Sequence, residues 1–481
     1  MSIRQSIGKT LILGWMIAGL QVYSMAQNPP AENPPNQSPT DNDSRTAPAT
    51  ALSGIAGMQT ENGPGDASSD VPQLPVLLGG PGISATFLSE MERSSYLRGG
   101  VNVGAAYDTN PLLLSSGESG NTSISIFPNI SVQESTSRMR WSLGYAGGLT
   151  INQSLANENQ DSQSLNFDSQ YRLSPHVNLR VAENFSLTTG FFDAGNGTES
   201  VVGPGSPNAS LLAPLSTQRS STTTVETNYH FALNDLVGAS GSFYDLHFSN
   251  VPVGTELTDS KTASAAAFWL HRIFGTDWGG ISYRFQRITF NPGGGETDVH
   301  SFLAVDTLNI SSRLTLTGFV GPQYTENQGL FPGELQATQS NGWSVSGGAE
   351  GAWKNQNTSV AAGYSRSISD GGGVLGTVLL QTVHANFRRE IVKGWAAALY
   401  AMHGTNQSLT VPLATTASSI NLTSAGISLD HNVAKSIGLR MGYSHDFQQQ
   451  FGLPAPTPTQ NASRNRVFVT LSYQWSKPLG M

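Results

Sequence analysis

The chain has 481 residues, of which 12% are charged and 38% are hydrophobic, and its formal net charge is −8. A mean hydropathy of −0.20 excludes a bundle of membrane-spanning helices, which would be far more apolar. The acidic balance argues against nucleic acid as a partner because no basic surface is available for phosphates, and the absence of cysteine excludes disulfides, thiolate metal sites and lipid attachment through an N-terminal cysteine.

The N-terminus has the pattern of a secretory signal peptide. Arg4 and Lys9 precede an apolar run at residues 11–20, and Ser24-Met25-Ala26 offers small residues at the two positions that a signal peptidase reads. A membrane anchor is the alternative, but about ten strongly apolar residues are half of the roughly twenty that a spanning helix needs. We therefore expect residues 1–26 to be a signal peptide that is removed on export.

Residues 27–95 form the next region, a periplasmic tail. From Gln27 to Asp70, Pro, Asn, Ser, Ala and Asp dominate, and this composition predicts disorder because little can be buried. Apolar residues return between Val71 and Arg93. This pre-barrel segment could lie at the mouth of a barrel, enter its lumen or act as a tether, and the sequence leaves these three alternatives open.

The rest of the chain, residues 96–481, alternates apolar and polar residues with the period of a β-strand. In the segment 141–152, for example, Trp141, Leu143 and Tyr145 share one face, and small or polar residues occupy the other. The pattern predicts about eighteen strands, at residues 97–108, 122–134, 138–153, 162–173, 176–190, 218–233, 235–248, 258–274, 277–290, 297–310, 312–326, 340–353, 357–369, 377–390, 392–404, 420–432, 436–447 and 463–475.

The connections distinguish a transmembrane barrel from a soluble β-sandwich. Those after even-numbered strands are tight, at Ser174-Pro175, Asn234, Gly275-Thr276, Ser311 and Ile391. Those after odd-numbered strands are mostly longer, as at residues 191–217 and 448–462. Short periplasmic turns and long external loops are typical of barrels of the Gram-negative outer membrane. We therefore expect an all-β fold, a transmembrane antiparallel β-barrel with up-and-down meander topology, embedded in outer-membrane lipid.

Aromatic residues near the predicted strand ends fit the girdles that flank the apolar band of such barrels; they are Tyr107, Trp141, Trp269, Trp278, Trp343, Trp353, Trp395 and Trp475. The alternation is interrupted at two places. The segment 420–432 changes phase between Leu422 and Ala425, and Glu183 falls on an otherwise apolar face. We expect β-bulges or shifted strand boundaries there.

The first strand carries a resemblance to a known family. Residues 97–110 are rich in glycine and end in Tyr107, Asp108 and Asn110, which resembles the opening strand of the second family of β-barrel porins of Gram-negative bacteria. The resemblance implies an outer-membrane barrel more firmly than it implies a cargo. The last strand, with Tyr473 and Trp475, looks like the signal that the barrel-assembly machinery reads, although residues 476–481 follow it.

Motifs for catalysis or cofactor binding are weak. Residues 371–376 match the dinucleotide fingerprint literally, but they lie in a predicted loop between strands, with no helix to receive a pyrophosphate. The nine histidines are scattered without the spacing of metal ligands. We expect no cofactor, no metal and no enzymatic activity. A membrane hydrolase remains an alternative, because Ser and His on neighbouring strands could meet on the barrel wall.

The predicted lumen is the better candidate site. If the apolar residues face lipid, the polar face of the strands directs a set of charged side chains inward, as candidate pore-lining residues: Arg98, Arg140, Arg180, Glu226, Arg284 and Arg440. Arg284 falls near mid-depth and is the strongest candidate for a constriction. The structural alternative is that these charges only pair with one another across a wet interior.

The leading hypothesis is a porin-like passive channel, because a barrel of about eighteen strands leaves an aqueous lumen unless something fills it. The cargo would be a small hydrophilic solute or an exported polysaccharide. The alternative is a non-conducting structural or surface-attachment barrel whose lumen is blocked by residues 71–95 or by the loop at 191–217.

Overall fold

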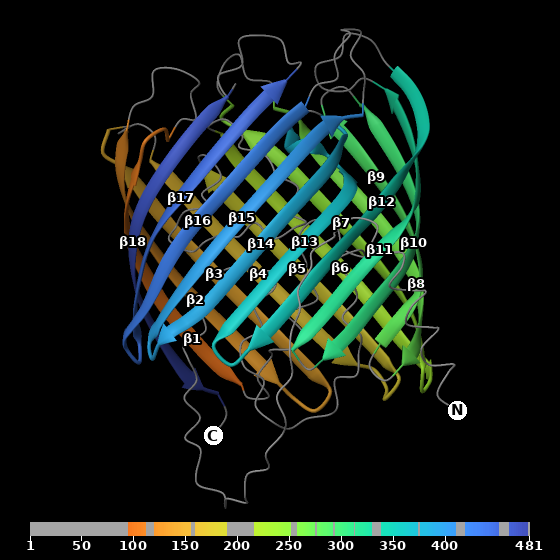
Figure 1. Ribbon diagram of the computed structural model, residues 1–481, viewed down its shortest axis with the longest axis horizontal. Coiled ribbons are helices and arrows are strands. Elements are labelled where there is room, and N and C mark those ends of the chain that lie inside the picture. The colour runs from red at the N-terminus through yellow and green to blue at the C-terminus, as the bar shows by residue number, and fades with distance from the viewer. Residues whose placement is uncertain are drawn as a thin grey trace, which may run out of the picture. The chain divides into compact units, whose positions relative to one another are not determined.

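The computed structural model describes residues 95–111, 120–154, 159–189, 216–251, 257–274, 277–291, 294–311, 313–329, 338–373, 376–409, 419–451 and 461–479. These residues form eighteen strands and one short 3₁₀ turn, η3 (Gly371–Gly373) (Figure 1). No helix among them is long and apolar enough to cross a membrane. The predicted signal peptide and the tail up to residue 94 lie outside the described residues.

The strands are β1 (Tyr96–Asp108), β2 (Asn121–Ser135), β3 (Met139–Asn152), β4 (Gln160–Arg172), β5 (Val177–Thr189), β6 (Thr217–Ala232), β7 (Asp235–Ser249), β8 (Asp259–Phe274), β9 (Asp277–Asn291), β10 (Glu296–Ser311), β11 (Leu314–Gly329), β12 (Thr338–Asn355), β13 (Thr358–Ser369), β14 (Val378–Val392), β15 (Trp395–Ser408), β16 (Ser419–Ala434), β17 (Ile437–Phe451) and β18 (Ala462–Pro478).

The sheet closes on itself. Each strand pairs antiparallel with the next strand in the chain, and β1 also pairs with β18 over its whole length, from Tyr96 opposite Pro478 to Asp108 opposite Arg466. A closed sheet has no free edge, so its backbone groups find partners without water. The predicted antiparallel barrel, with an up-and-down meander of 18 strands, is confirmed.

The two rims differ as the sequence predicts. Connections after even-numbered strands are short and those after odd-numbered strands are mostly longer, and we refer to the short-turn rim and the long-loop rim. The turns predicted at Ser311 and Ile391 are misplaced, because Ser311 is the last residue of β10 and Ile391 lies inside β14. Strand β14 continues to Val392 and the turn lies at Lys393-Gly394, where Gly394 takes the φ of +82° that glycine tolerates best.

Successive residues of each strand face the outside and the lumen in turn. Large apolar side chains such as Leu149, Ile281 and Val320 are exposed on the outer side, as expected for contact with acyl chains. One predicted girdle residue is misplaced. Trp278 is only 3% exposed and packs on the lumenal side in a cluster with Leu236.

The β-bulges or shifted strand boundaries expected at two places are also wrong, because both places lie inside regularly paired strands. Strand β16 pairs with β15 without interruption from Ser419 to His431, and the apolar residues Ile420 and Leu422 are buried on the lumenal side. Strand β5 keeps its register with β4 and β6, and Glu183 faces outward, where its carboxylate accepts hydrogen bonds from the Ser221 and Thr223 hydroxyls. Both interruptions of the pattern therefore come from side-chain choice on a regular strand.

Candidate functional site

Small polar residues line much of the lumenal side. On β8 the positions Ser260, Thr262 and Ser264 are buried, whereas Lys261 and Ala263 between them face outward. Neighbouring strands repeat the rule at lumenal positions that include Thr222, Thr224, Ser240, Ser242, Ser282, Gln286, Ser301 and Thr307. Hydroxyl and amide groups can bond water or a hydrophilic solute, so this wall suits an aqueous interior.

Two of the predicted pore-lining residues lie side by side. Arg180 on β5 is the direct register partner of Glu226 on β6. The Arg180 guanidinium also donates to Asp168 on β4, with Nη2 2.6 Å from Oδ2, and Glu226 accepts a hydrogen bond of 2.8 Å from Asn228. Arg180 is therefore fixed within a paired network on the barrel wall.

Arg440 has a similar setting on later strands. Its Nε lies 2.5 Å from Oδ1 of Asp430, its register partner on β16. Arg388 on β14 contacts the other oxygen of the same carboxylate at 2.6 Å. Two arginines thus share one aspartate on the lumenal side of the wall.

Arg284, Arg98 and Arg140 lie on separate strands. Arg284 on β9 sits on the lumenal side between Ser282 and Gln286, and its Nη2 donates to Gln286 Oε1 at 3.0 Å. The Arg98 guanidinium lies 5.5 Å from the centroid of the Tyr96 ring. Arg140 on β3 is the register partner of Ser135 and Gln170. The predicted residues are therefore distributed around the wall and do not form one cluster.

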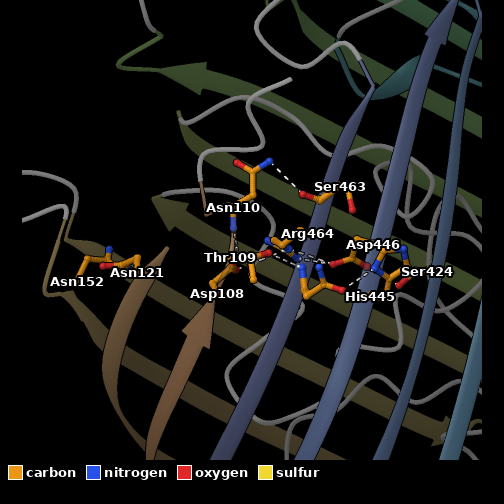
Figure 2. Close-up of polar contacts among 11 residues, drawn as sticks. Asp108, Thr109, Asn110, Asn121, Asn152, Ser424, His445, Asp446, Ser463 and Arg464 are labelled. Carbon is orange, nitrogen blue, oxygen red and sulfur yellow. Dashed lines mark hydrogen bonds and ion pairs between the residues drawn. The ribbon is translucent and has the colours of Figure 1, made fainter. Parts of the chain in front are cut away.

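A further charged group, not predicted from the sequence, lies where β1 meets β18 (Figure 2). Arg464 on β18 is 4% exposed, and its Nη2 lies 2.8 Å from Asp446 Oδ2 on β17. Its Nε lies 3.8 Å from Asp108 Oδ2 on β1. The Ser424 hydroxyl on β16 donates to Asp446 at 2.6 Å. Four strands on both sides of the closure therefore share one network.

The chain just beyond Asp108 completes this closure. Thr109 N donates to the backbone oxygen of Asn465, and Asn465 N donates to Thr109 Oγ1, each over 3.0 Å. The Asn110 amide donates to the Ser463 carbonyl at 3.0 Å, and its backbone N–H donates to Asp108 Oδ1 at the same distance. The Asp108 and Asn110 corner that carries the family resemblance thus fastens the first strand to the last.

Not all of the lumenal side is polar. Near the short-turn rim of β7 to β10, a buried cluster consists of apolar residues, namely Leu236, Ala266, Phe268, Leu270, Trp278, Leu303 and Val305. Leu236 has 0% of its surface exposed. The Arg272 guanidinium lies 4.9 Å from the centroid of the Trp278 ring and borders the cluster. This part of the wall is packed like a protein core.

The carboxylates that pair with the predicted arginines were missed by the sequence analysis. A signal for them exists, because a short turn fixes the register of a hairpin. The tight turn between β16 and β17 places Asp430 opposite Arg440, and that between β4 and β5 brings Asp168 near Arg180. Asp108 and Arg464 carry no such local signal, since they belong to opposite ends of the barrel sequence.

The histidine contacts bear on the hydrolase alternative. His247 Nδ1 lies 2.5 Å from Asp259 on β8, and His403 Nδ1 lies 2.9 Å from Thr423 Oγ1 on β16. The Asp259 carboxylate and the Thr423 hydroxyl therefore contact two different histidines. In the part of the chain that the structure describes, no group of three His, Asp or Glu residues is arranged to hold a metal ion.

No protein-family model and no curated protein sequence matches the chain. Among solved structures, OpdK from Pseudomonas aeruginosa is 11% identical over 79% of this chain and 99% of that chain, with a TM-score of 0.39. OpdQ from the same organism is 10% identical over 80% and 98%, with a TM-score of 0.38. The ferric-catecholate import receptor Fiu from Escherichia coli is 9% identical over 80% and 82%, with a TM-score of 0.43. The closed barrel and its apolar outer face themselves make this chain an outer-membrane β-barrel.

Proposed function

We propose that the chain is a porin-like passive channel for hydrophilic solutes. The observation that carries this proposal is the polar lumenal wall of an 18-stranded closed sheet, because barrels of 16 to 18 strands are wide enough for an aqueous channel. The resemblance of residues 97–110 to the second β-barrel porin family supports it. A bulky exported polysaccharide is the other cargo that this wall chemistry suits.

Conductance in a planar lipid bilayer tests the proposal directly. Purified, refolded protein is expected to insert and to raise the current in discrete steps. Folded protein that inserts, as shown by its resistance to added protease, without raising the current would contradict the channel. Permeation of sugars of increasing size into liposomes then distinguishes a channel for small solutes from one for long polysaccharides, because a polysaccharide needs a wider passage.

A non-conducting structural barrel is the second candidate, and one observation favours it. The residues of the lumenal apolar cluster around Leu236 and Trp278 are at most 7% exposed, whereas a wall in contact with bulk water would leave such side chains more exposed. The same bilayer experiment decides between the two candidates.

The proposal also includes the route to the membrane. Residues 1–26 direct export, residues 27–95 form a periplasmic tail, and the last strand, β18 with Tyr473 and Trp475 facing outward, is read by the barrel-assembly machinery. No catalytic role is assigned.

A further inference from the structure

The long-loop end of the β13–β14 hairpin turns toward the lumen. We define the β13–β14 tip as residues 368–373 and 376–380. Its Asp370 carboxylate is buried and accepts a hydrogen bond from Ser260 on β8. The Gly373 carbonyl accepts a hydrogen bond of 2.9 Å from the backbone N–H of Thr258, just before β8. Because Ser260 is a lumenal position, the tip lies inside the mouth and not outside the wall.

A second set of contacts ties the tip to β9 and β10. Thr377 Oγ1 lies 2.6 Å from Thr297 Oγ1 on β10. Apolar side chains of the tip and of the lumenal wall pack together beside this pair, namely Ile368 and Leu379 with Ile288, Phe290 and Val299. Thr297 itself is 0% exposed. The tip therefore covers the inner surface of strands that are not its neighbours in the sheet.

Glycines make this approach possible. Gly371, Gly372, Gly373 and Gly376 all have positive φ angles, between 60° and 79°. A Cβ at Gly373 would collide with the Phe248 ring and would lie 2.7 Å from the Thr258 carbonyl oxygen. The glycine run that resembles a nucleotide fingerprint thus serves a turn pressed closely against the wall.

We propose that the β13–β14 tip is a movable cover of the channel mouth, held over the lumenal face of β8 to β10 by the Asp370–Ser260 and Thr377–Thr297 contacts. Its effect on permeation rests on the channel proposed above. Among the residues that the structure describes here, the attachment consists of a few side-chain and loop hydrogen bonds and one small apolar cluster, without a strand ladder. Water can replace such hydrogen bonds when the tip swings away, and the glycines permit the backbone change.

The first test measures the cover without relying on conduction. A Thr297→Cys variant places one thiol under the tip in a chain that has no cysteine, and a membrane-impermeant maleimide reports its accessibility in folded protein. We expect alkylation to accelerate by about tenfold when Gly373→Ala is added, because the new methyl group pushes the tip off Phe248. Asp370→Lys, which places a long cation where a buried carboxylate sits, should give the same result.

Two matched controls accompany this measurement. Gly342→Ala on β12 adds a methyl group that meets nothing within 4 Å, so the thiol at position 297 should react as slowly as before. A thiol at Ser264→Cys, which contacts Ser242 and not the tip, should react at one rate in every background. If neither Gly373→Ala nor Asp370→Lys changes the alkylation rate at position 297, the proposal of a cover is wrong. It is also wrong if the rate at position 264 rises equally, because that would mean general loosening of the wall.

The second test asks whether the cover controls permeation. A Thr297→Cys/Thr377→Cys pair can form a disulfide where two hydroxyl oxygens lie 2.6 Å apart, and the pair is combined with Asp370→Lys. Reduction is expected to raise the conductance of a single channel and reoxidation to lower it. The control pair Ser242→Cys/Ser264→Cys, across the fixed wall at 2.7 Å, should show no redox effect. If reduction and reoxidation leave the conductance unchanged, the tip does not control permeation. If no variant conducts, the channel proposal is wrong, and the alkylation result alone tests the cover.

Discussion

Asp108 on the first strand and Arg464 on the last strand meet inside the barrel, with 3.8 Å between Oδ2 and Nε. Arg464 also pairs with Asp446 at 2.8 Å, and all three side chains are buried. Closure of a barrel needs one pairing between the two ends of its sequence, and here a shared cation reinforces it. Residues that open the barrel sequence thereby contribute to the stability of its final hairpin.

Replacing the shared cation should weaken the barrel more than replacing either carboxylate. Arg464→Met leaves Asp446 buried without its ion-pair partner and removes one of the two arginines that interact electrostatically with Asp108, so we expect a loss of about 3–5 kcal/mol in the free energy of unfolding. Urea denaturation followed by gel mobility measures it. Lys261→Met is the matched control, because the Lys261 side chain is 62% exposed and its ion pair with Asp245 is long, with 3.7 Å between Nζ and Oδ1. A loss at Arg464 no larger than at Lys261 would remove this network from the closure.

The apolar lumenal cluster gives a second stability prediction. Leu236 is fully buried in one cluster with Phe268 and Trp278, so Leu236→Ala should destabilise the barrel by about 2–5 kcal/mol through lost contacts and a cavity. Leu233 in the adjacent turn is 91% exposed, and Leu233→Ala should have almost no effect. Equal effects of the two changes would show that the cluster does not pack as a core.

The sequence predicts the barrel well because strand period, turn length and strand count are local properties. Asp430 and Arg440 face each other across one short turn, so even their ion pair follows from hairpin register. The Asp108–Arg464 contact does not, since its register depends on the whole circumference. The tip could not be predicted either, because the alternation of strands says nothing about which loop turns inward.

The side chains that face the unexpected side of the wall share one cause. The prediction assumed that apolar residues face lipid and polar residues face the lumen. Trp278 and Ile420 face inward, and Glu183 faces outward with two hydroxyl partners. Packing against Leu236 stabilises Trp278 and hydrogen bonds stabilise Glu183, without any change of strand register. A single sequence does not reveal such compensation.

Arg284 allows a test of ion selectivity in the proposed channel. It faces the lumen from β9 next to Gln286, so Arg284→Glu should move the reversal potential under a salt gradient toward cation preference. Lys261→Glu makes the same change of charge on the outer face of β8 and should leave the potential unchanged. If both variants conduct with the potential of the original protein, Arg284 does not line the constriction.

Acidification should strengthen the cover through Asp370. Burial raises the pKa of the Asp370 carboxyl above its ordinary value, although hydrogen bonds from Ser260, Gly372 and Ser369 partly oppose the rise. The carboxyl in the displaced, solvated tip should titrate near the usual aspartate value of about 3.9. A pKa that is higher in the covered state means that the proton is bound preferentially there, so protonation favours the cover.

The pH window follows from the same shift. Protonation of Asp370 stabilises the covered state. This stabilisation is complete below the ordinary carboxyl pKa and is lost as pH rises through the raised pKa. Alkylation of a Thr297→Cys thiol, normalised to the Ser264→Cys thiol, should therefore slow as pH falls through this window. Tyr244 on β7 interacts electrostatically with Asp370, but a phenol with an ordinary pKa near 10 stays neutral throughout.

Asp370→Asn isolates the titration of Asp370 from other effects of pH on the barrel. An amide keeps an oxygen that accepts from Ser260 but has no proton to gain. We expect the normalised alkylation rate in this variant to be independent of pH, and to match the slow rate of the original protein at acid pH. A pH dependence that persists unchanged in Asp370→Asn would show that a different group controls the tip, since protonation of Asp370 is then not the event that holds it in place.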